Sequence, residues 1–303
     1  MRQMNNHCDK RVFIESTRQG ADLAMLRLLD ELELPATAKQ IAIKPNFCDY
    51  RGPETGVVTT TVTLQPMLAE LRRRYPAARI ILFEHDATGT DADTMVDYCN
   101  LRPLLSEFQV EFLNLRKDRW RTIRVDGYRF RELEVPETVV ASDLVINHPK
   151  LKTHGRTKMT CGLKNIFACH FIKNKTRLHP FLDEAIVDIN LAVRSDIVIV
   201  DGILGVEGNR GPTQGFPARR DILIGGRNVV SVDALAARVM GFWPLGVRHL
   251  RMAWRKGLGS PWPRAVSDCN LKTIEPFQFS YSKYMLLEMI RKALRGGNGE
   301  SRL

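Results

Sequence analysis

Short apolar runs alternate along the chain with stretches in which apolar residues recur at helical spacing. The runs are typical of buried strands, and they cover residues 11–15, 41–44, 80–83, 110–115, 144–146, 197–200 and 222–224. Helical spacing covers residues 19–32, 62–74, 91–107 with a break at Pro103, 182–193 and 228–240. This alternation predicts an α/β fold with a mainly parallel sheet and helices on both faces. Residues 116–138 predict an antiparallel strand pair inserted into that pattern.

Polar residues follow four of the predicted strands directly, which suggests one shared site. They are Lys44-Pro45-Asn46, Glu84-His85-Asp86, Asn147-His148-Pro149-Lys150 and Asp201-Gly202. In a parallel sheet the C-terminal ends of the strands lie along one rim, and ligands bind there. We therefore expect a composite site at that rim, with Lys44, Asn46 and Asp201 among its ligand-binding residues.

The segment between Asp143 and Asp183 contains no acidic residue. It holds eight Lys and Arg residues and four of the chain's seven histidines, so its positive charge has no local counterpart. Cations on a glycine-containing loop neutralise phosphate or carboxylate groups. We expect Lys150, Lys152 and Lys164 to bind such an anion and Asn165 to orient it. The alternative is a solvated basic loop.

Lys152, His154 and Cys161 are the candidates for catalysis in this segment. Neighbouring cations lower the pKa of a histidine, so we expect His154 to be neutral and to act as an acid, a base or a hydrogen-bond donor. A positive field also favours the thiolate, which is the reactive form of a cysteine, at Cys161. The alternatives are an ordinary hydrogen-bonding histidine and a small buried cysteine.

The glycines after Asp201 indicate a second contribution to the site. Residues 205–215 read GVEGNRGPTQG, and we expect Gly211 to let the backbone approach a ligand closely. The spacing matches no nucleotide-binding motif, and a structural turn is the alternative. No His-x-x-x-His or Cys-x-x-Cys spacing occurs, so we predict no metal site and no iron–sulfur cluster. The sequence names no cofactor.

The composition is that of a globular protein whose surface favours acidic partners. The chain has 303 residues, 44% of them hydrophobic, and a formal net charge of +11. It contains neither a signal-peptide pattern nor a run of eighteen apolar residues, so we expect a cytoplasmic protein without a transmembrane segment. We expect a polar leader at 1–10 and one α/β domain at 11–270. At 271–303 we expect a basic amphipathic helix and tail that packs on the domain or a partner rather than on a membrane.

The motifs, taken in order, resemble those of the domain of unknown function 362 family. Its pattern fits Lys44-Pro45-Asn46, Pro149 to His154 (PKLKTH), Leu163-Lys164-Asn165, Val200-Asp201-Gly202, Gly211-Pro212 with Gly215, and Val232-Asp233-Ala234. The resemblance covers about residues 39–245. It implies an α/β fold, an uncharacterised activity and functional roles for Lys150, Lys152, His154, Lys164 and Asn165.

The chain departs from this family at its cysteines. Many members carry a ferredoxin-like iron–sulfur module, and the cysteines of that module are absent here, so we expect a member without it. Cys161 stands where the family pattern leads us to expect a small or hydroxyl residue. The resemblance names no reaction.

Three functions follow as hypotheses. The first is a cytoplasmic enzyme that acts on a small phosphorylated or carboxylated substrate. The second is a non-catalytic carrier or electron-transfer partner that docks an acidic protein. The third, RNA binding, is disfavoured because the aromatic residues of the basic segment, Phe167 and Phe171, lie in an apolar run.

Overall fold

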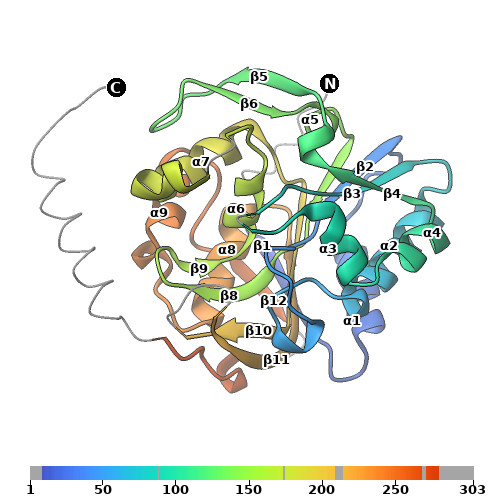
Figure 1. Ribbon diagram of the computed structural model, residues 1–303. Coiled ribbons are helices and arrows are strands. Elements are labelled where there is room, and N and C mark those ends of the chain that lie inside the picture. The colour runs from blue at the N-terminus through green and yellow to red at the C-terminus, as the bar shows by residue number, and fades with distance from the viewer. Residues whose placement is uncertain (1–8, 88, 173–174, 209–213, 268–270, 280–303) are drawn as a thin grey trace, which may run out of the picture.

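The computed structural model describes residues 9–87, 89–172, 175–208, 214–267 and 271–279 (Figure 1). The strands are β1 (Arg11–Ser16), β2 (Gln40–Lys44), β3 (Arg79–Glu84), β4 (Val110–Asn114), β5 (Trp120–Arg124), β6 (Glu132–Pro136), β7 (Leu144–Asn147), β8 (Lys150–His154), β9 (Lys158–Thr160), β10 (Ile197–Glu207), β11 (Phe216–Gly226) and β12 (Arg264–Ser267). The α-helices are α1 (Ala21–Glu31), α2 (Thr61–Arg74), α3 (Ala92–Tyr98), α4 (Arg102–Glu107), α5 (Glu137–Val140), α6 (Gly162–Asn165), α7 (Leu182–Ala192), α8 (Val229–Val239) and α9 (Arg248–Arg255). The 3-10 helices are η2 (Pro53–Thr55), η3 (Leu115–Lys117), η4 (Ile166–Ala168), η5 (Lys175–Phe181), η6 (Pro244–Gly246) and η7 (Leu271–Thr273).

Ten of the described strands form one sheet, whose main path runs β12-β1-β11-β10-β7-β2-β3-β4. Neighbours along this path are parallel except at β11, which is antiparallel to both β1 and β10. The central strands β2, β3 and β7 are buried along most of their length, as expected for parallel strands covered on both faces. The predicted α/β fold with a mainly parallel sheet is confirmed.

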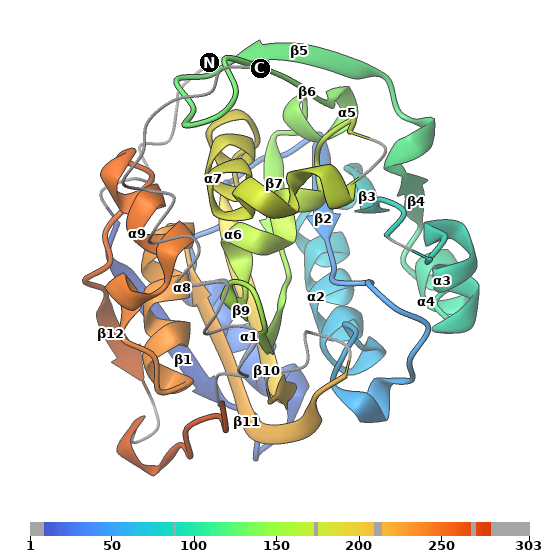
Figure 2. The same ribbon diagram turned by 60° about the vertical axis from the view of Figure 1, so that its left-hand side comes forward.

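Helices cover both faces of this sheet (Figure 2). On one face, α1 and α2 pack on a core that includes Leu64 and Ile199. On the other face, α7, α8 and α9 pack on a core that joins Leu235 to Val198. Successive residues of a strand point to opposite faces, which is why the neighbours Val198 and Ile199 belong to different cores.

The chain changes its direction along the sheet between β2 and β7. From β2 it continues through α2 to β3, whereas from β7 it continues through α7 to β10 on the other side. Sheets of this kind bind ligands at such a point, outside the C-terminal ends of the strands. The polar residues that follow β2 and β7 lie at this point of the sheet. The predicted antiparallel pair is present beside the main sheet as the hairpin of β5 and β6.

The basic segment begins as a β-hairpin, so the loop expected there is wrong. β8 and β9 pair antiparallel, and β8 also pairs with β10 in parallel. The physical reason is the alternation Lys-Leu-Lys-Thr-His, which fits a strand: Lys150 and Lys152 point to one side, and Leu151 between them joins the apolar core.

Three further expectations differ from the structure. β10 does not end at Asp201 but continues to Glu207, with an irregularity after Gly202. The helix expected over 91–107 is two helices, α3 and α4, and β12 was not predicted.

The expected domain boundaries touch parts of the chain that the structure describes incompletely. Packing continues past residue 270, because Phe277 is buried against the α8 side of the core. Residues 1–8 of the expected leader and the helix expected near 283–295 lie outside the described residues.

Candidate functional site

Two of the predicted anion-binding lysines form buried ion pairs with carboxylates from other strands. Lys44 Nζ lies 2.7 Å from the carboxylate of Glu84, at the end of β3. Lys150 Nζ lies 2.9 Å from Oδ2 of Asp201, on β10. Burial lowers the pKa of Lys150, and the charge of Asp201 opposes that shift. Both cations are therefore neutralised within the protein.

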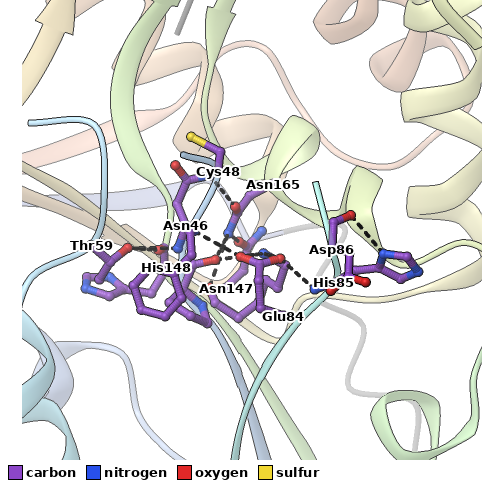
Figure 3. A network of polar contacts seen from close by, with 12 residues as sticks. Asn46, Cys48, Thr59, Glu84, His85, Asp86, Asn147, His148 and Asn165 are labelled. Atoms are coloured by element: carbon purple, nitrogen blue, oxygen red, sulfur yellow. Dashed lines mark hydrogen bonds and ion pairs between the residues drawn. The ribbon is translucent and has the colours of Figure 1, made fainter. Parts of the chain in front are cut away.

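Three asparagines connect the ends of β2 and β7 to α6 (Figure 3). Asn46 Nδ2 donates to Asn165 Oδ1 at 2.9 Å, and Asn165 Nδ2 donates to Asn147 Oδ1 at 2.8 Å. Asn165 Nδ2 also lies 3.2 Å from the carbonyl oxygens of Lys44 and Pro45. Such a chain of satisfied buried amides fixes the position of the loop after β2.

Lys152 is fully buried and has no acidic partner among the residues that the structure describes. Its Nζ donates to Asn46 Oδ1 at 2.6 Å and to the carbonyl of Val57 at 2.9 Å, and it lies 3.3 Å from Cys48 Sγ. The acceptors are an amide, a peptide carbonyl and a thiol. A buried ammonium group in this setting leaves a positive charge without a compensating carboxylate.

His154, two residues further along β8, is half-buried. Its Nδ1 accepts the backbone N–H groups of Arg156 and Thr157 at 3.1 and 3.3 Å, so the proton of the neutral ring lies on Nε2. Burial lowers the pKa of His154 well below its usual range, and the charges of Lys164 and Lys152 lower it further. Both effects favour the neutral ring, in which Nε2–H is the donor.

His148 and Thr63 complete the network beside Asp201. His148 Nδ1 donates to the carbonyl of Ile199 at 2.6 Å, so Nε2 is an acceptor and receives the hydroxyl of Thr63 at 2.9 Å. The same hydroxyl lies 3.3 Å from Asp201 Oδ2. Burial lowers the pKa of His148, which keeps the ring neutral.

Cys161 lies in the apolar core. It is fully buried, and burial, followed by the charge of Asp233, raises its pKa well above the usual range. The carboxylate of Asp233 accepts the backbone N–H groups of Gly162 and Leu163 at 2.8 and 2.9 Å, which ties α8 to the start of α6. A buried, protonated thiol is a poor nucleophile, so the chemistry proposed below does not use Cys161.

The remaining predicted residues are Lys164 and Gly211. Lys164 is half-buried on α6, with Nζ 6.0 Å from the centre of the Phe167 ring. Its charge lowers the pKa of His154, so the two side chains interact electrostatically. Gly211 lies outside the described residues. Within the described part of the chain, no three or more His, Cys, Asp or Glu residues are grouped so that they could hold a metal.

The contacts that Cys48, Thr63 and Glu84 make in this network were not predicted from the sequence. Glu84 carries the same signal as Lys44, since it directly follows a predicted strand, and it could have been paired with a lysine on that ground. Thr63 and Cys48 carry no such signal. Their partners, His148 and Lys152, are 85 and 104 residues away in the sequence.

Comparison with known proteins identifies the family. The model of the family described as a domain of unknown function (DUF362) matches residues 41–238. The chain belongs to the DUF362 family. The match extends from β2 into α8, so it includes all of the polar network around Lys152.

Two other proteins resemble this DUF362 member. The thylakoid-associated protein sll1697 of Synechocystis sp. is 31% identical over 256 residues, which are 80% of this chain and 78% of that protein. The structure of the lactate racemase apoprotein from Thermoanaerobacterium thermosaccharolyticum aligns with a TM-score of 0.47 at 13% identity, covering 79% of this chain and 59% of the racemase. A likeness of that degree says nothing of activity.

Proposed function

We propose that this DUF362 protein is an enzyme that binds a small phosphorylated or carboxylated substrate beside Lys152, His154 and Lys164. The observation that carries the proposal is the buried ammonium group of Lys152, which has only uncharged neighbours to bond. A buried charge without a counter-charge lowers the free energy of unfolding. An anionic ligand supplies that counter-charge, and proteins retain unfavourable buried charges at functional sites.

The paired lysines of the network do not contribute to this binding. Lys44 and Lys150 each have a carboxylate within 2.9 Å, so neither pair carries net charge. The charges of Lys164, Lys152 and Arg156 all lower the pKa of His154, so they act at this histidine. The proposed site is therefore smaller than the one expected from the sequence, and it lies at the end of β8 and on α6.

His154 acts in this proposal as a hydrogen-bond donor. Its Nδ1 is occupied by two backbone N–H groups, so Nε2 keeps its proton and can offer it to an anion. A general base needs an available lone pair, and neither ring nitrogen offers one in this arrangement. A neutral donor of this kind stabilises negative charge that develops on a substrate oxygen during reaction.

Asn46 and Asn165 are positioning residues in this proposal. Asn46 Oδ1 holds Lys152 Nζ at 2.6 Å, and Asn165 fixes the Asn46 amide through its own Oδ1. Because Asn165 also bonds the loop after β2, it keeps the acceptor of Lys152 in one orientation.

Thermal unfolding in the presence of anions tests the proposal. Inorganic phosphate, pyrophosphate and small dicarboxylates are compared with chloride at equal ionic strength. A ligand that binds the native state raises Tm by mass action, so we expect one anion class to raise the Tm of the wild type. The half-buried Lys164 is changed to Met, which removes a cation of the site, and we expect most of this rise to disappear.

The matched control is Lys39→Met, which also removes one positive charge. Lys39 is exposed and directly precedes β2, so it lies at the end of that strand that is remote from the rim with the candidate site. It should leave the anion response unchanged. The proposal fails if no anion exceeds chloride, or if both variants respond alike. Protection by an acidic protein or by RNA, with no response to small anions, would favour the carrier or the RNA-binding hypothesis instead.

We place this activity in the cytoplasm, with contact to a membrane surface. Helices that could cross a bilayer are absent from the part of the chain that the structure describes. The relative from Synechocystis is named for its association with thylakoids, and it matches 80% of this chain. That relationship supports a peripheral membrane contact as part of the proposal.

A further inference from the structure

A second acid-free segment lies near the C-terminal end of the described chain. Between Asp233 and Asp268 there is no Asp or Glu, while the segment holds six Lys and Arg residues and three of the four tryptophans. Those tryptophans are unusually exposed for their size: Trp243 by 60%, Trp262 by 44% and Trp254 by 40%. Large exposed aromatic side chains next to unopposed cations mark an interaction surface.

Two of these tryptophans lie side by side on the surface of the protein. The rings of Trp243 and Trp262 are 5.5 Å apart, and the guanidinium of Arg238 lies 6.0 Å from the centre of the Trp262 ring. Arg251 Nη1 donates at 2.7 Å to the carbonyl of Leu245, two residues after Trp243.

Lys158 reaches the same surface from β9. A side chain added at Gly246 would meet both Lys158 Nζ and Trp243 Cβ, at 3.6 and 3.7 Å. We call the group of Trp243, Trp262, Arg238, Arg251 and Lys158 the tryptophan surface.

The backbone holds both rings in place. The turn after Trp243 is closed by the bond from Gly246 N to the Trp243 carbonyl at 2.8 Å. Trp262 stands between two prolines, and the carbonyl of Ser260 accepts the hydroxyl of Ser231 at 3.0 Å. Rings displayed on fixed turns lose little conformational entropy when they bind a partner.

The arginines of this surface are available to a partner. Arg238 and Arg251 are paired with no carboxylate within the part of the chain that the structure describes; their contacts are with the Trp262 ring and the Leu245 carbonyl. In contrast, the neighbouring Arg248 and Lys256 bond to Glu184 and Asp126. Two arginines without a described carboxylate partner therefore lie near the two tryptophans.

We infer that the tryptophan surface docks on a bilayer that contains anionic lipids. Tryptophan rings have their most favourable position at the membrane–water interface, and nearby arginines and lysines are attracted to anionic headgroups. Single-stranded nucleic acid is the less suitable partner, because it needs open ring faces on which bases stack. The Trp262 ring already contacts the tilted Trp243 ring and the guanidinium of Arg238, which compete with a base for its faces.

This docking places the candidate site close to the bilayer. Lys158 of the tryptophan surface is the cross-strand neighbour of His154 in the β8–β9 hairpin. The choice of a membrane as partner rests on the peripheral location proposed above. The surface itself is argued from its own residues and shares none with the anion site.

Vesicle sedimentation of the full chain tests the inference. The protein is mixed with vesicles of phosphatidylcholine alone or with added phosphatidylglycerol. We expect binding to the anionic vesicles only, with a blue shift of tryptophan fluorescence and a loss of binding at high salt. The double change Trp243→Ala with Trp262→Ala should weaken binding by at least about tenfold. Arg238→Gln should weaken it about fivefold.

Matched controls remove equivalent groups elsewhere on the surface. Tyr98→Ala takes away an aromatic ring that is 53% exposed and packs edge-on against Tyr50, and Arg121→Gln takes away an exposed arginine of β5. Neither should change vesicle binding. Circular dichroism and Tm confirm that each variant is folded.

The outcomes separate this inference from the proposals on which it builds. If the wild type does not bind anionic vesicles, the proposals of a peripheral location and of a docking surface are both wrong. If the wild type binds and the tryptophan variant binds equally well, the location stands and the surface is wrong. If the wild type binds a single-stranded oligonucleotide but no vesicles, and the tryptophan variant loses the oligonucleotide binding, the surface binds nucleic acid instead. The anion-induced rise in Tm should be the same in all of these proteins.

Discussion

The two acid-free segments of this chain, 144–182 and 234–267, have similar sequence properties and opposite structures. In the first, Lys150 and Lys152 are buried, and Lys150 pairs with a carboxylate from another strand. In the second, Arg238 stands exposed beside Trp262, and no described carboxylate pairs with it. A local excess of cations therefore does not by itself indicate an anion site. Whether a cation is free to bind an anion depends on whether the fold places a carboxylate from another part of the chain beside it.

The difference follows from where the fold places each segment. β8 pairs with β10, and the adjoining strands of the sheet end at the same rim. Asp201 of β10 therefore lies next to Lys150 of β8. The second segment runs from α8 through η6 and α9 to the edge strand β12, on the outer side of the sheet. There Arg238 is exposed together with Trp243 and Trp262. Carboxylates from elsewhere reach only other cations of the segment, as in the bonds of Arg248 to Glu184 and of Lys256 to Asp126.

The largest expected difference between the two segments is in stability. Lys150→Met removes one partner of a buried ion pair and leaves the carboxylate of Asp201 uncompensated, so we expect the free energy of unfolding to fall by about 3–5 kcal/mol. Arg238→Gln removes an exposed charge and should change it by less than about 0.5 kcal/mol. Urea unfolding monitored by fluorescence measures both values.

A double variant checks the reason for that loss. Lys150→Met combined with Asp201→Leu removes both charges, and it should be clearly more stable than Lys150→Met alone. If the double variant is as unstable as the sum of the two single changes, packing rather than charge pairing sets the stability of this region. The contrast between the segments would then have another cause.

The part of this arrangement that the sequence predicts is the part encoded locally. Continuous apolar runs such as Ile80 to Phe83 specify buried parallel strands, and the polar residue after each run specifies the rim of the sheet. For the same reason Lys44, Asn46 and Asn147 could be expected to lie near one another. The β8–β9 hairpin was missed because its charged residues resemble those of a loop.

The pairing of the charges is not encoded locally. Lys44 and Glu84 are 40 residues apart, and they meet only because β2 and β3 are neighbours in the sheet. The pKa of Cys161 is likewise raised in part by Asp233, which lies on α8 and is distant in the sequence. The sequence indicates that Lys and Arg residues are concentrated in one segment. The tertiary structure determines which of these residues have a carboxylate beside them.

A smaller effect distinguishes the two lysines of β8 from each other. Lys152→Met leaves only neutral acceptors without a donor, chiefly Asn46 Oδ1 and the Val57 carbonyl. It should change the free energy of unfolding by less than about 2 kcal/mol in either direction. The unsatisfied acceptors cost stability, whereas the removal of a buried charge that has no counter-charge restores it. The same variant should lose the rise in Tm that anions produce. A loss of stability equal to that of Lys150→Met would show that Lys152 is held by a charge, which contradicts the basis of the proposed site.

The smallest expected effect concerns an acid that is intermediate between the buried and exposed cases. Glu70 on α2 is 7% exposed, but its partner Arg73 is 71% exposed. Hydrogen bonds from Arg73 and then Arg74 lower the pKa of Glu70 from 4.5 to about 2, against the opposing effect of burial. A carboxyl whose pKa is lowered by folding stabilises the native state fully above its unfolded pKa and loses that contribution as the pH falls through its folded pKa.

Glu70→Gln should therefore lower the free energy of unfolding at pH 7, and the difference from the wild type should shrink as the pH falls from about 4.5 toward about 2. Solvent screens the exposed guanidinium of Arg73, so we expect about 1 kcal/mol rather than the full value of the shift. The control is Glu111→Gln in the pair of Arg79 and Glu111, where both side chains are about half exposed and the loss should be smaller still. Urea unfolding at several pH values measures both. If the two variants lose equal stability, or if the loss does not depend on pH, then the burial of a carboxylate does not determine how strongly its ion pair stabilises this fold. The contrast between the two basic segments would then need a different explanation.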